Sequence, residues 1–408
     1  MSDKKFQLKI AEKNESGFFT SYSKDGKFIS YYGDNHPQYA GNVVKAMASA
    51  KDGYPYIVDI FDDINESNRE NQNVLNNEWI NFKKSLDEKL IAVVHEVIRL
   101  TPTIVEVIFY APLAAERFQP GQFYRLQNFE TSAKKTKDGT PLLMEGLALT
   151  GAWQDKEKGL ISIIVLEMGV SSRLCALLEK GEKVILMGPT GAPTEIHENE
   201  DVILLGGGLG NAVLFSIGKA MREKNCRVLY FAGYKKGEDL YHQPNVEASA
   251  DQVIWSTDSG EVIIPNRKQD SHFRGNILQS MEAYSRGELG EKLFEIKDAK
   301  RLVVIGSDRM MAAVKNARHN ALKDLFGEHT AVGSINSPMQ CMMKEVCAQC
   351  LQRHVDPETG KESFVFSCYN QDQNLDNVDF DFLNSRLKAN SVLEKISNMW
   401  FDKIETTL

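Results

Sequence analysis

Four of the six cysteines lie in one short stretch near the C-terminal end, with a spacing suited to a metal centre. Cys341, Cys347, Cys350 and Cys368 read CxxxxxCxxC, then seventeen residues, then C. The flanks of 357–360 are β-prone and the PETG between them has turn chemistry, so we expect a hairpin that brings Cys350 roughly opposite Cys368. Cross-strand neighbours lie about 5 Å apart, which would let these cysteines share one small inorganic centre.

Three kinds of chemistry fit this set: a [2Fe-2S] cluster, zinc, or a CxxC dithiol. Zinc sites more often pair two CxxC knuckles, whereas three clustered thiolates and one distant thiolate favour an iron–sulfur cluster. His354 could replace a ligand, although a solvated strand histidine is the simpler interpretation. Cys175 and Cys226 stand in apolar contexts, and we interpret them as small buried residues.

Composition places the chain among globular proteins with more than one core. Its 408 residues contain 42% hydrophobic and 25% charged residues, and a domain averages about 150 residues, so we expect two to four domains. The net charge of -8 argues against a nucleic-acid partner. The N-terminal sequence lacks a signal-peptide core, and no run approaches the roughly 18 apolar residues of a membrane span. We therefore expect a cytoplasmic protein, where clustered cysteines bind metal more often than they form disulfides.

Residues 1–88 form an N-terminal extension in which we see no chemistry. Alternating patterns predict strands around 6–13, 18–24 and 27–33, and the next segment predicts a short helix that Gly53 ends. The acidic, amide-rich stretch 62–77 is typical of a solvated loop. A cap or a partner-docking element is the interpretation that we prefer.

The remaining chain changes its periodicity twice. Short strands with turn signals predict an antiparallel barrel over 89–198. Buried strands alternating with helices predict a parallel α/β domain over 199–333. The cysteine segment, 334–375, follows, and apolar residues near helical spacing predict one or two amphipathic helices over 376–408. The expected fold is thus α/β plus all-β.

Turns at the carboxyl ends of the parallel strands are candidate nucleotide sites. The segment Gly206–Gly210 stands between a buried strand and a helix, where glycines admit a pyrophosphate and the helix start favours an anion. It is not the GxGxxG fingerprint, and a tight packing turn is the alternative. Gly306–Met310 forms a second strand-to-helix turn. Asp258 and Gly260 follow another strand, and their sequence fits a simple loop as well as it fits a nucleotide contact.

The barrel carries a second candidate phosphate cradle and a candidate ring contact. Gly169, Ser171 and Ser172 follow a strand and begin a helix, so they would offer flexible backbone and hydroxyl donors; an ordinary capped helix is the alternative. The segment Pro120–Arg125 adds an aromatic side chain and a cation that could sit against a flat ring, although such residues are more often structural.

The order of these parts resembles a known family. The supporting motifs, besides the cysteines, are Pro120–Phe123, Gly169 with Ser171–Ser172, Gly188–Gly191, Gly206–Ala212, Glu238–Leu240 and Gly306–Met310. Over about 89–372 they resemble the electron-transfer subunit of dihydroorotate dehydrogenase and the small flavoprotein subunit of NADH-dependent ferredoxin:NADP oxidoreductase, in the ferredoxin-reductase superfamily. The whole chain is similar to the C-terminal part of long bacterial proteins that begin with a flavoprotein related to the glutamate synthase small subunit.

The resemblance implies FAD on the barrel, NAD(P)H in the α/β domain and a [2Fe-2S] cluster on the cysteines. Electrons would pass to a partner, either a glutamate-synthase-small-subunit-like flavoprotein or a ferredoxin-linked oxidoreductase subunit, and no catalytic acid or base is required. The implied cofactor contacts are Gln122, Phe123, Tyr124, Arg125, Leu147, Ala148, Leu149, Gly169, Ser171, Ser172, Gly207, Gly208, Gly210, Asn211, Asp258, Gly306, Asp308 and Met310, and the implied metal ligands are Cys341, Cys347, Cys350 and Cys368.

The chain departs from the family pattern in three places. The family's flavin strand carries an arginine where this chain has Met144–Leu149, with Glu145 inside it. One additional residue separates Cys341 from Cys347, and Val213 replaces a proline. Two other functions remain open: a non-catalytic interaction subunit with structural zinc and a degenerate flavin site, or a stand-alone NAD(P)H-dependent flavin reductase.

Overall fold

The computed structural model describes residues 11–61, 72–339, 341 and 345–405. The chain divides into two compact units, Met1–Ser85 and Leu86–Leu408. Among the described residues, no helix combines the length and the apolarity that a membrane crossing requires.

The N-terminal unit is a β-hairpin with helices. Strands β1 (Thr20–Lys24) and β2 (Lys27–Ser30) pair antiparallel and confirm two of the three predicted strands. The strand predicted over 6–13 lies mostly outside the described residues, which begin at residue 11. The prediction that Gly53 ends a helix is wrong, because α1 (Val43–Phe61) continues through it. A Cβ atom on Gly53 would overlap the ring of Tyr32, so this glycine makes room for packing inside the helix.

The helix α2 (Gln72–Leu90) follows. The loop predicted over 62–77 is therefore wrong for 72–77, and its first part, 62–71, lies outside the described residues. The apolar side chains of α2 are exposed, among them Trp79 at 63% and Ile80 at 60%.

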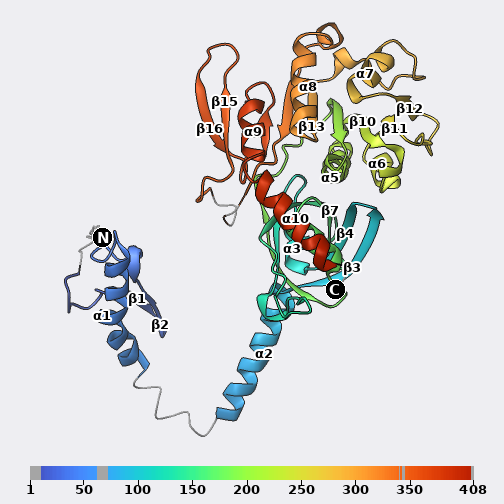
Figure 1. The fold of residues 1–408 in the computed structure, drawn as a ribbon. Coiled ribbons are helices and arrows are strands. Elements are labelled where there is room, and N and C mark those ends of the chain that lie inside the picture. The colour runs from blue at the N-terminus through green and yellow to red at the C-terminus, as the bar shows by residue number, and fades with distance from the viewer. Residues whose placement is uncertain (1–10, 62–71, 340, 342–344, 406–408) are drawn as a thin grey trace. The chain divides into compact units, whose positions relative to one another are not determined.

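Six antiparallel strands close into the predicted barrel (Figure 1). Their order is β3-β4-β7-β6-β5-β8. Alternating side chains point inward, so that Val105, Val107 and Phe109 of one strand are each at most 1% exposed. Two short helices, α3 (Pro112–Arg117) and α4 (Val170–Leu174), lie in its connections. The strands are β3 (Ala92–Thr101), β4 (Ile104–Tyr110), β5 (Phe123–Asn128), β6 (Leu147–Asp155), β7 (Leu160–Leu166) and β8 (Lys183–Thr190).

The predicted parallel sheet is also present. Its seven strands have the order β12-β11-β10-β9-β13-β14-β17, and all but the last run parallel. The helices α5 (Gly210–Glu223), α6 (Gln243–Ala248), α7 (Ile277–Ser285) and α8 (Asp308–His319) lie in the connections between these strands. The strands are β9 (Asp201–Gly207), β10 (Arg227–Lys236), β11 (Gln252–Ser259), β12 (Ser271–Arg274), β13 (Arg301–Ile305), β14 (Thr330–Ser334) and β17 (Asp372–Asn374).

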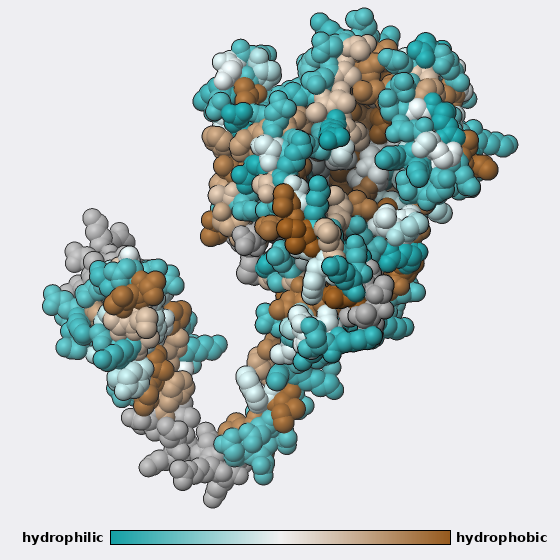
Figure 2. Space-filling model, in the orientation of Figure 1, coloured by the Kyte–Doolittle hydropathy of each residue, from teal (hydrophilic) through white to brown (hydrophobic). Residues whose placement is uncertain are grey.

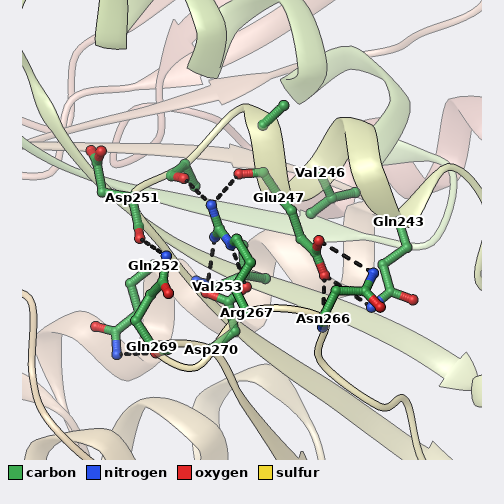
Figure 3. Close-up of polar contacts among 12 residues, drawn as sticks. Gln243, Val246, Glu247, Asp251, Gln252, Val253, Asn266, Arg267, Gln269 and Asp270 are labelled. Carbon is green, nitrogen blue, oxygen red and sulfur yellow. Dashed lines mark hydrogen bonds and ion pairs between the residues drawn. The ribbon is translucent and has the colours of Figure 1, made fainter.

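A buried ionic network fixes the long connection between β11 and β12 (Figure 3). Arg267 donates to both carboxylate oxygens of Asp270, at 2.7 and 2.9 Å, and to the carbonyl oxygens of Glu247 and Ala250. The Asp270 side chain is fully buried and also accepts from the amide of Val253 at 2.8 Å. One arginine thus connects this loop, α6 and the start of β11.

The cysteine segment is an insertion between the last two sheet strands. Strands β15 (Leu351–Val355) and β16 (Glu362–Phe366) form the predicted antiparallel hairpin, with Leu351 opposite Phe366. The chain then returns to the sheet as β17, beside β14.

Two helices end the described chain, α9 (Phe380–Leu387) and α10 (Ser391–Glu405), which confirms the helical prediction. The Asp376 carboxylate, just after β17, accepts from Arg318 at 2.9 Å and His319 at 2.8 Å, both on α8. Burial would raise the pKa of Asp376, but these partners outweigh it and lower the pKa below its ordinary value.

Candidate functional site

The strand order creates a switch point at the carboxyl edge of the sheet. From β9 the chain continues to β10, β11 and β12 on one side, and then returns to β13 and β14 on the other side of β9. Ligands of open α/β sheets bind outside the carboxyl ends of strands at such a point. The glycine loop Gly206–Gly210 follows β9 and the second turn Gly306–Met310 follows β13, so both predicted nucleotide turns lie there.

The two turns pack directly against each other. A Cβ atom on Gly207 or on Gly306 would overlap the sulfur of Met310, and a Cβ on Gly210 would overlap the carbonyl oxygen of Ile305. Gly208 has a φ of +55°, in the left-handed region that favours glycine. The glycines therefore allow close backbone approach at the switch point, and Met310 lies over both turns.

Buried polar side chains hold the glycine loop from beneath. Asn211 is 0% exposed and donates to the carbonyl oxygens of Gly208 at 3.0 Å and Gly233 at 3.3 Å. The hydroxyl of Tyr230 donates to the Asn211 side chain at 2.9 Å, and that of Tyr241 donates to the Gly208 carbonyl at 3.1 Å. Asn211, predicted as a cofactor contact, thus uses its side chain to shape the loop; the two tyrosines were not predicted.

The other predicted residues at this edge differ in their surroundings. Ser307 caps α8 by accepting from the amide of Met310 at 3.2 Å. The carboxylate of Asp308 accepts from Asn384 of α9 at 2.6 Å, so it is already engaged by the protein. Asp258 is exposed at the end of β11, and the nearby Arg274, which was not predicted, donates to the Gly260 carbonyl at 2.8 Å.

On the barrel, the side chains that were predicted to contact a flat ring face different directions. Gln122 bonds within the loops, donating to the Gly191 carbonyl at 2.9 Å. Tyr124 is a core residue, 0% exposed, and burial raises its pKa. Phe123 instead lies on the other face of its strand and packs against Cys350 and Cys368. Phe123 is therefore a barrel residue that contacts the cysteine pair.

Arg125 has a guanidinium without a complete set of partners. Its Nε is buried and has no hydrogen-bond partner in the described chain. The guanidinium lies against Gly146, where a Cβ atom would overlap it. Arg125 pairs with Ala148 across the strands, so the two side chains share a face. A cation thus borders the segment Met144–Leu149, which lacks the arginine expected from the family resemblance.

The second predicted cradle forms a capped helix start. The Ser172 hydroxyl accepts from the amides of Met168 and Gly169, at 3.0 Å each, and Ser171 accepts from the Glu145 amide at 3.1 Å. Both hydroxyls therefore already accept hydrogen bonds from backbone amides of the chain. Leu147 and Leu149 are half-buried and pack against the barrel core.

A small cleft joins the barrel face to the cysteine segment. It encloses about 30 Å³. Phe123 and Ala148 line this cleft and also pack against the cysteine pair. The remaining lining residues are Gly121, Thr150, Ser334, Ile335, Asn336, Met339 and Gln371.

The four predicted ligands lie in one region but differ in exposure. Cys350 and Cys368 are 1% and 0% exposed, whereas Cys347 is exposed. Burial, followed by the hydrogen bond with the Cys350 thiol, raises the pKa of Cys368 to about 12. The Cys347 sulfur accepts from the amides of Cys341 and Gln349, at 3.4 Å each.

The loop before Cys350 has an unusual backbone. Glu345 and Ala348 have φ values of 61° and 57°, which side chains other than glycine rarely adopt. Across the described residues, no three His, Cys, Asp or Glu side chains converge closely enough to hold a metal ion. His354 donates from Nε2 to the side-chain oxygen of Gln373 at 2.7 Å in a buried position, so the expectation that it is solvated is wrong.

A buried carboxylate joins the barrel to the parallel sheet domain. Glu106 of β4, 1% exposed, accepts from Ser162 at 2.5 Å and Trp153 at 2.8 Å, and bonds His242, at the start of α6, at 2.9 Å. Burial would raise its pKa, but these hydrogen bonds lower it overall. The contact holds the two folds together and was not predicted, because its partners are far apart in sequence.

Known proteins share parts of this sequence. No family model matches the chain. It is 34% identical to an uncharacterised protein of Rickettsia prowazekii over 370 residues, covering 90% of this chain and 41% of that protein. It is 24% identical to the dihydroorotate dehydrogenase B (NAD(+)) electron transfer subunit of Enterococcus faecalis, covering 65% of this chain and 88% of that subunit. The chain spans 41% to 54% of the length of the first three curated relatives.

A solved structure of NADH-dependent reduced ferredoxin-NADP oxidoreductase has the same fold. It matches with a TM-score of 0.60 and 21% identity, over 76% of this chain and 98% of the matched chain. The barrel followed by the parallel sheet, together with the relatives named as electron transfer subunits, agrees with the predicted resemblance. The chain thus has the fold of the ferredoxin-reductase-like proteins that its sequence resembles.

Proposed function

We propose that this chain is an electron-transfer flavoprotein subunit that oxidises NAD(P)H through FAD and passes electrons by a [2Fe-2S] cluster to a partner oxidoreductase. The observation that carries the proposal is the position of Phe123, which lines the cleft on the outer barrel face and packs against Cys350 and Cys368. A flavin at this cleft would lie in contact with the cysteine segment, a short path for electrons.

The cofactors would supply the redox chemistry, since FAD takes two electrons as hydride from NAD(P)H and releases them singly to an iron–sulfur cluster. The protein's part is to bind and orient these groups. Accordingly, the proposal assigns no side chain the role of acid or base.

The switch point at the carboxyl edge of the sheet supports the proposed nucleotide site. The glycine loop Gly206–Gly210 opens α5, whose free amides and positive dipole end suit a pyrophosphate. Because Asn211 and Tyr241 hold its carbonyl groups from beneath, the loop is preorganised before a ligand arrives. Gly207, Gly208, Gly210 and Gly306 would contact the nucleotide through the backbone, and Met310 would border it.

The Arg125 guanidinium supports the proposed binding of FAD. A half-buried, partly unsatisfied cation beside Gly146 is suited to an anionic group, and arginine can bind a phosphate bidentately. Arg125 would thereby replace the arginine that Met144–Leu149 lacks. Gly169 would border the same phosphates, while the ring would occupy the cleft beside Ala148 and require Met339 or Asn336 to move, because 30 Å³ is room for little more than a water molecule.

For the cluster, the support is the chemistry of the cysteine set. Amide donors to the Cys347 sulfur stabilise a thiolate, and Glu345 and Ala348, both left-handed, lie two residues before and one residue after this cysteine. The buried pair Cys350 and Cys368 would complete the site with Cys341. Such a set would hold a cluster whose role is to accept electrons one at a time.

For the partner, the support is the surface at Cys347. This cysteine is exposed and its neighbour Val346 is 79% exposed, so a cluster there would lie at the surface. The partner that we propose is a glutamate-synthase-small-subunit-like flavoprotein or a ferredoxin-linked oxidoreductase subunit.

Anaerobic purification with iron, sulfide and flavin quantified on one sample tests the proposal. We expect FAD together with equal amounts of iron and sulfide, and loss of visible absorbance when NADH or NADPH is added. Zinc without iron or flavin would instead support a non-catalytic interaction subunit. FAD without iron, with unchanged NADH-to-dye activity in Cys347→Ser, would support a stand-alone flavin reductase.

A further inference from the structure

Arg386, on α9, places a charged group against the loop between Cys347 and Cys350. Its guanidinium donates to the carbonyl oxygen of Gln349, and its Cζ lies 5.6 Å from the centroid of the Phe382 ring. Its Nε is buried and has no hydrogen-bond partner in the described chain. Since Gln349 also donates its amide to the Cys347 sulfur, Arg386 contacts the residue that touches a proposed ligand.

The charge of Arg386 is not balanced by the described protein. No ion pair of Arg386 with a carboxylate occurs among the residues that the structure describes. Arg353 provides the contrast: it lies over the same ring, also at 5.6 Å, but bonds Asp379 at 2.7 Å and lies 3.6 Å from Glu362. Burying an unpaired charge is costly unless an opposite charge or hydrogen bonds compensate it.

The helix end explains only part of this arrangement. A cation in the last turn of α9 interacts favourably with the helix dipole, and that interaction gives no reason to bury Nε. The opposite charge missing from the described chain is one that cysteine thiolates would supply at the adjacent loop.

We infer that Arg386 is the charge partner of the iron–sulfur site and raises the reduction potential of the cluster. The inference rests on the proposed function, since it requires a cluster on the four cysteines. Reduction adds one electron to a site that already carries the negative charge of its thiolates, and a nearby half-buried cation favours the more negative state. Arg386 would act through electrostatics and through its hydrogen bond to the Gln349 carbonyl, without ligating iron.

The test is a dye-mediated redox titration of the full chain loaded with iron and sulfide, followed by visible absorption. Arg386→Gln should shift the cluster midpoint to a more negative potential. The matched control is Lys388→Gln, which removes the same charge from an exposed position at the end of the same helix. Because Coulomb energies scale inversely with the dielectric constant, about 20 near protein and about 80 in water, we expect a roughly fourfold larger shift at Arg386.

A second variant guards against failure to fold. The histidine of Arg386→His is a cation at about pH 5 and neutral by about pH 8. Between these pH values, the cluster midpoint of this variant should therefore shift further toward negative potential than the midpoint of the unchanged protein. Equal shifts in Arg386→Gln and Lys388→Gln, or identical pH profiles for Arg386→His and the unchanged protein, would overturn the inference. A chain that takes up no iron and sulfide before any substitution would instead refute the proposed function.

Discussion

Replacing Arg125 on strand β5 by Gln should weaken FAD binding by a predictable factor. The Nε of this arginine is already buried and unpartnered in the described chain, so much of its desolvation cost falls on folding rather than on phosphate binding. A hydrogen bond to a charged group contributes about 1.5–3 kcal/mol, and each 1.4 kcal/mol is tenfold in affinity. We therefore expect the FAD dissociation constant to rise roughly 10- to 150-fold.

The assay is titration of flavin-free protein with FAD, followed by quenching of flavin fluorescence. Riboflavin, which has no phosphate, should bind Arg125→Gln and the unchanged protein equally well if the guanidinium meets the phosphates. Arg117→Gln, which removes an exposed cation from the same barrel, should leave FAD affinity unaltered. Equal losses of FAD and riboflavin would place the guanidinium at the ring instead.

Gly146 offers an independent check on the same contact. A Cβ atom there would overlap the Arg125 guanidinium, so Gly146→Ala should weaken FAD binding by displacing it. Since both changes remove one interaction, the double variant should be no weaker than Arg125→Gln alone. Additive losses, or FAD affinity in Arg125→Gln equal to that of the unchanged protein, would rule out a phosphate contact at Arg125.

Three other contacts give testable expectations. Gly207→Ala should push the sulfur of Met310 into the proposed nucleotide site and weaken NADH binding in a fluorescence titration, and Met310→Ala added to it should restore binding; no rescue would contradict this packing. Arg267→Met should lower the free energy of unfolding in urea by about 3–5 kcal/mol, because it leaves the buried Asp270 unpaired, and a loss below about 1 kcal/mol would contradict that expectation. The lowered pKa of Asp376 means that its stabilisation is present above the unfolded pKa of about 3.9 and is lost as the pH falls through the folded pKa, so urea titrations should show less acid sensitivity in Asp376→Asn than in the unchanged protein.

The barrel and the parallel sheet could be predicted because their periodicities are local properties of the chain. Short strands separated by turn signals indicate the barrel, and continuous apolar runs such as β9 indicate strands buried on both faces. The end of the sheet could not be predicted in this way. Strand β17 consists of Asp372, Gln373 and Asn374, which have low strand propensity, and it forms because β14 offers an unpaired edge.

The residues of the site were predictable by type, but their roles depend on register. Arg125 was expected at a flat ring, yet it lies against Gly146, because β5 and β6 pair Arg125 with Ala148. Asn211 looked like a nucleotide contact because it follows the glycines, whereas its side chain holds the loop from below. Such directions follow from packing between distant segments, which a motif does not contain.

Helix α10 has one apolar side exposed and the other anchored to the barrel. Figure 2 shows brown, hydrophobic atoms over α10, and the exposed fractions of Val392 and Leu393 there are 66% each. The opposite side of this helix is anchored, since Phe401 is 0% exposed and Asp402 bonds Arg173 at 2.6 Å. The helix is therefore held firmly on the barrel while its apolar side remains uncovered in this chain.

The main proposal is that electrons from NAD(P)H reach an iron–sulfur cluster through FAD within this chain. Its sharpest test is electron paramagnetic resonance of the anaerobic, cofactor-loaded protein, frozen after addition of NADH or NADPH. We expect the signal of a reduced [2Fe-2S] cluster, which is absent when FAD has been removed and returns when FAD is added back. A bleached flavin with no reduced-cluster signal, in protein shown to contain iron and sulfide, would contradict the proposal.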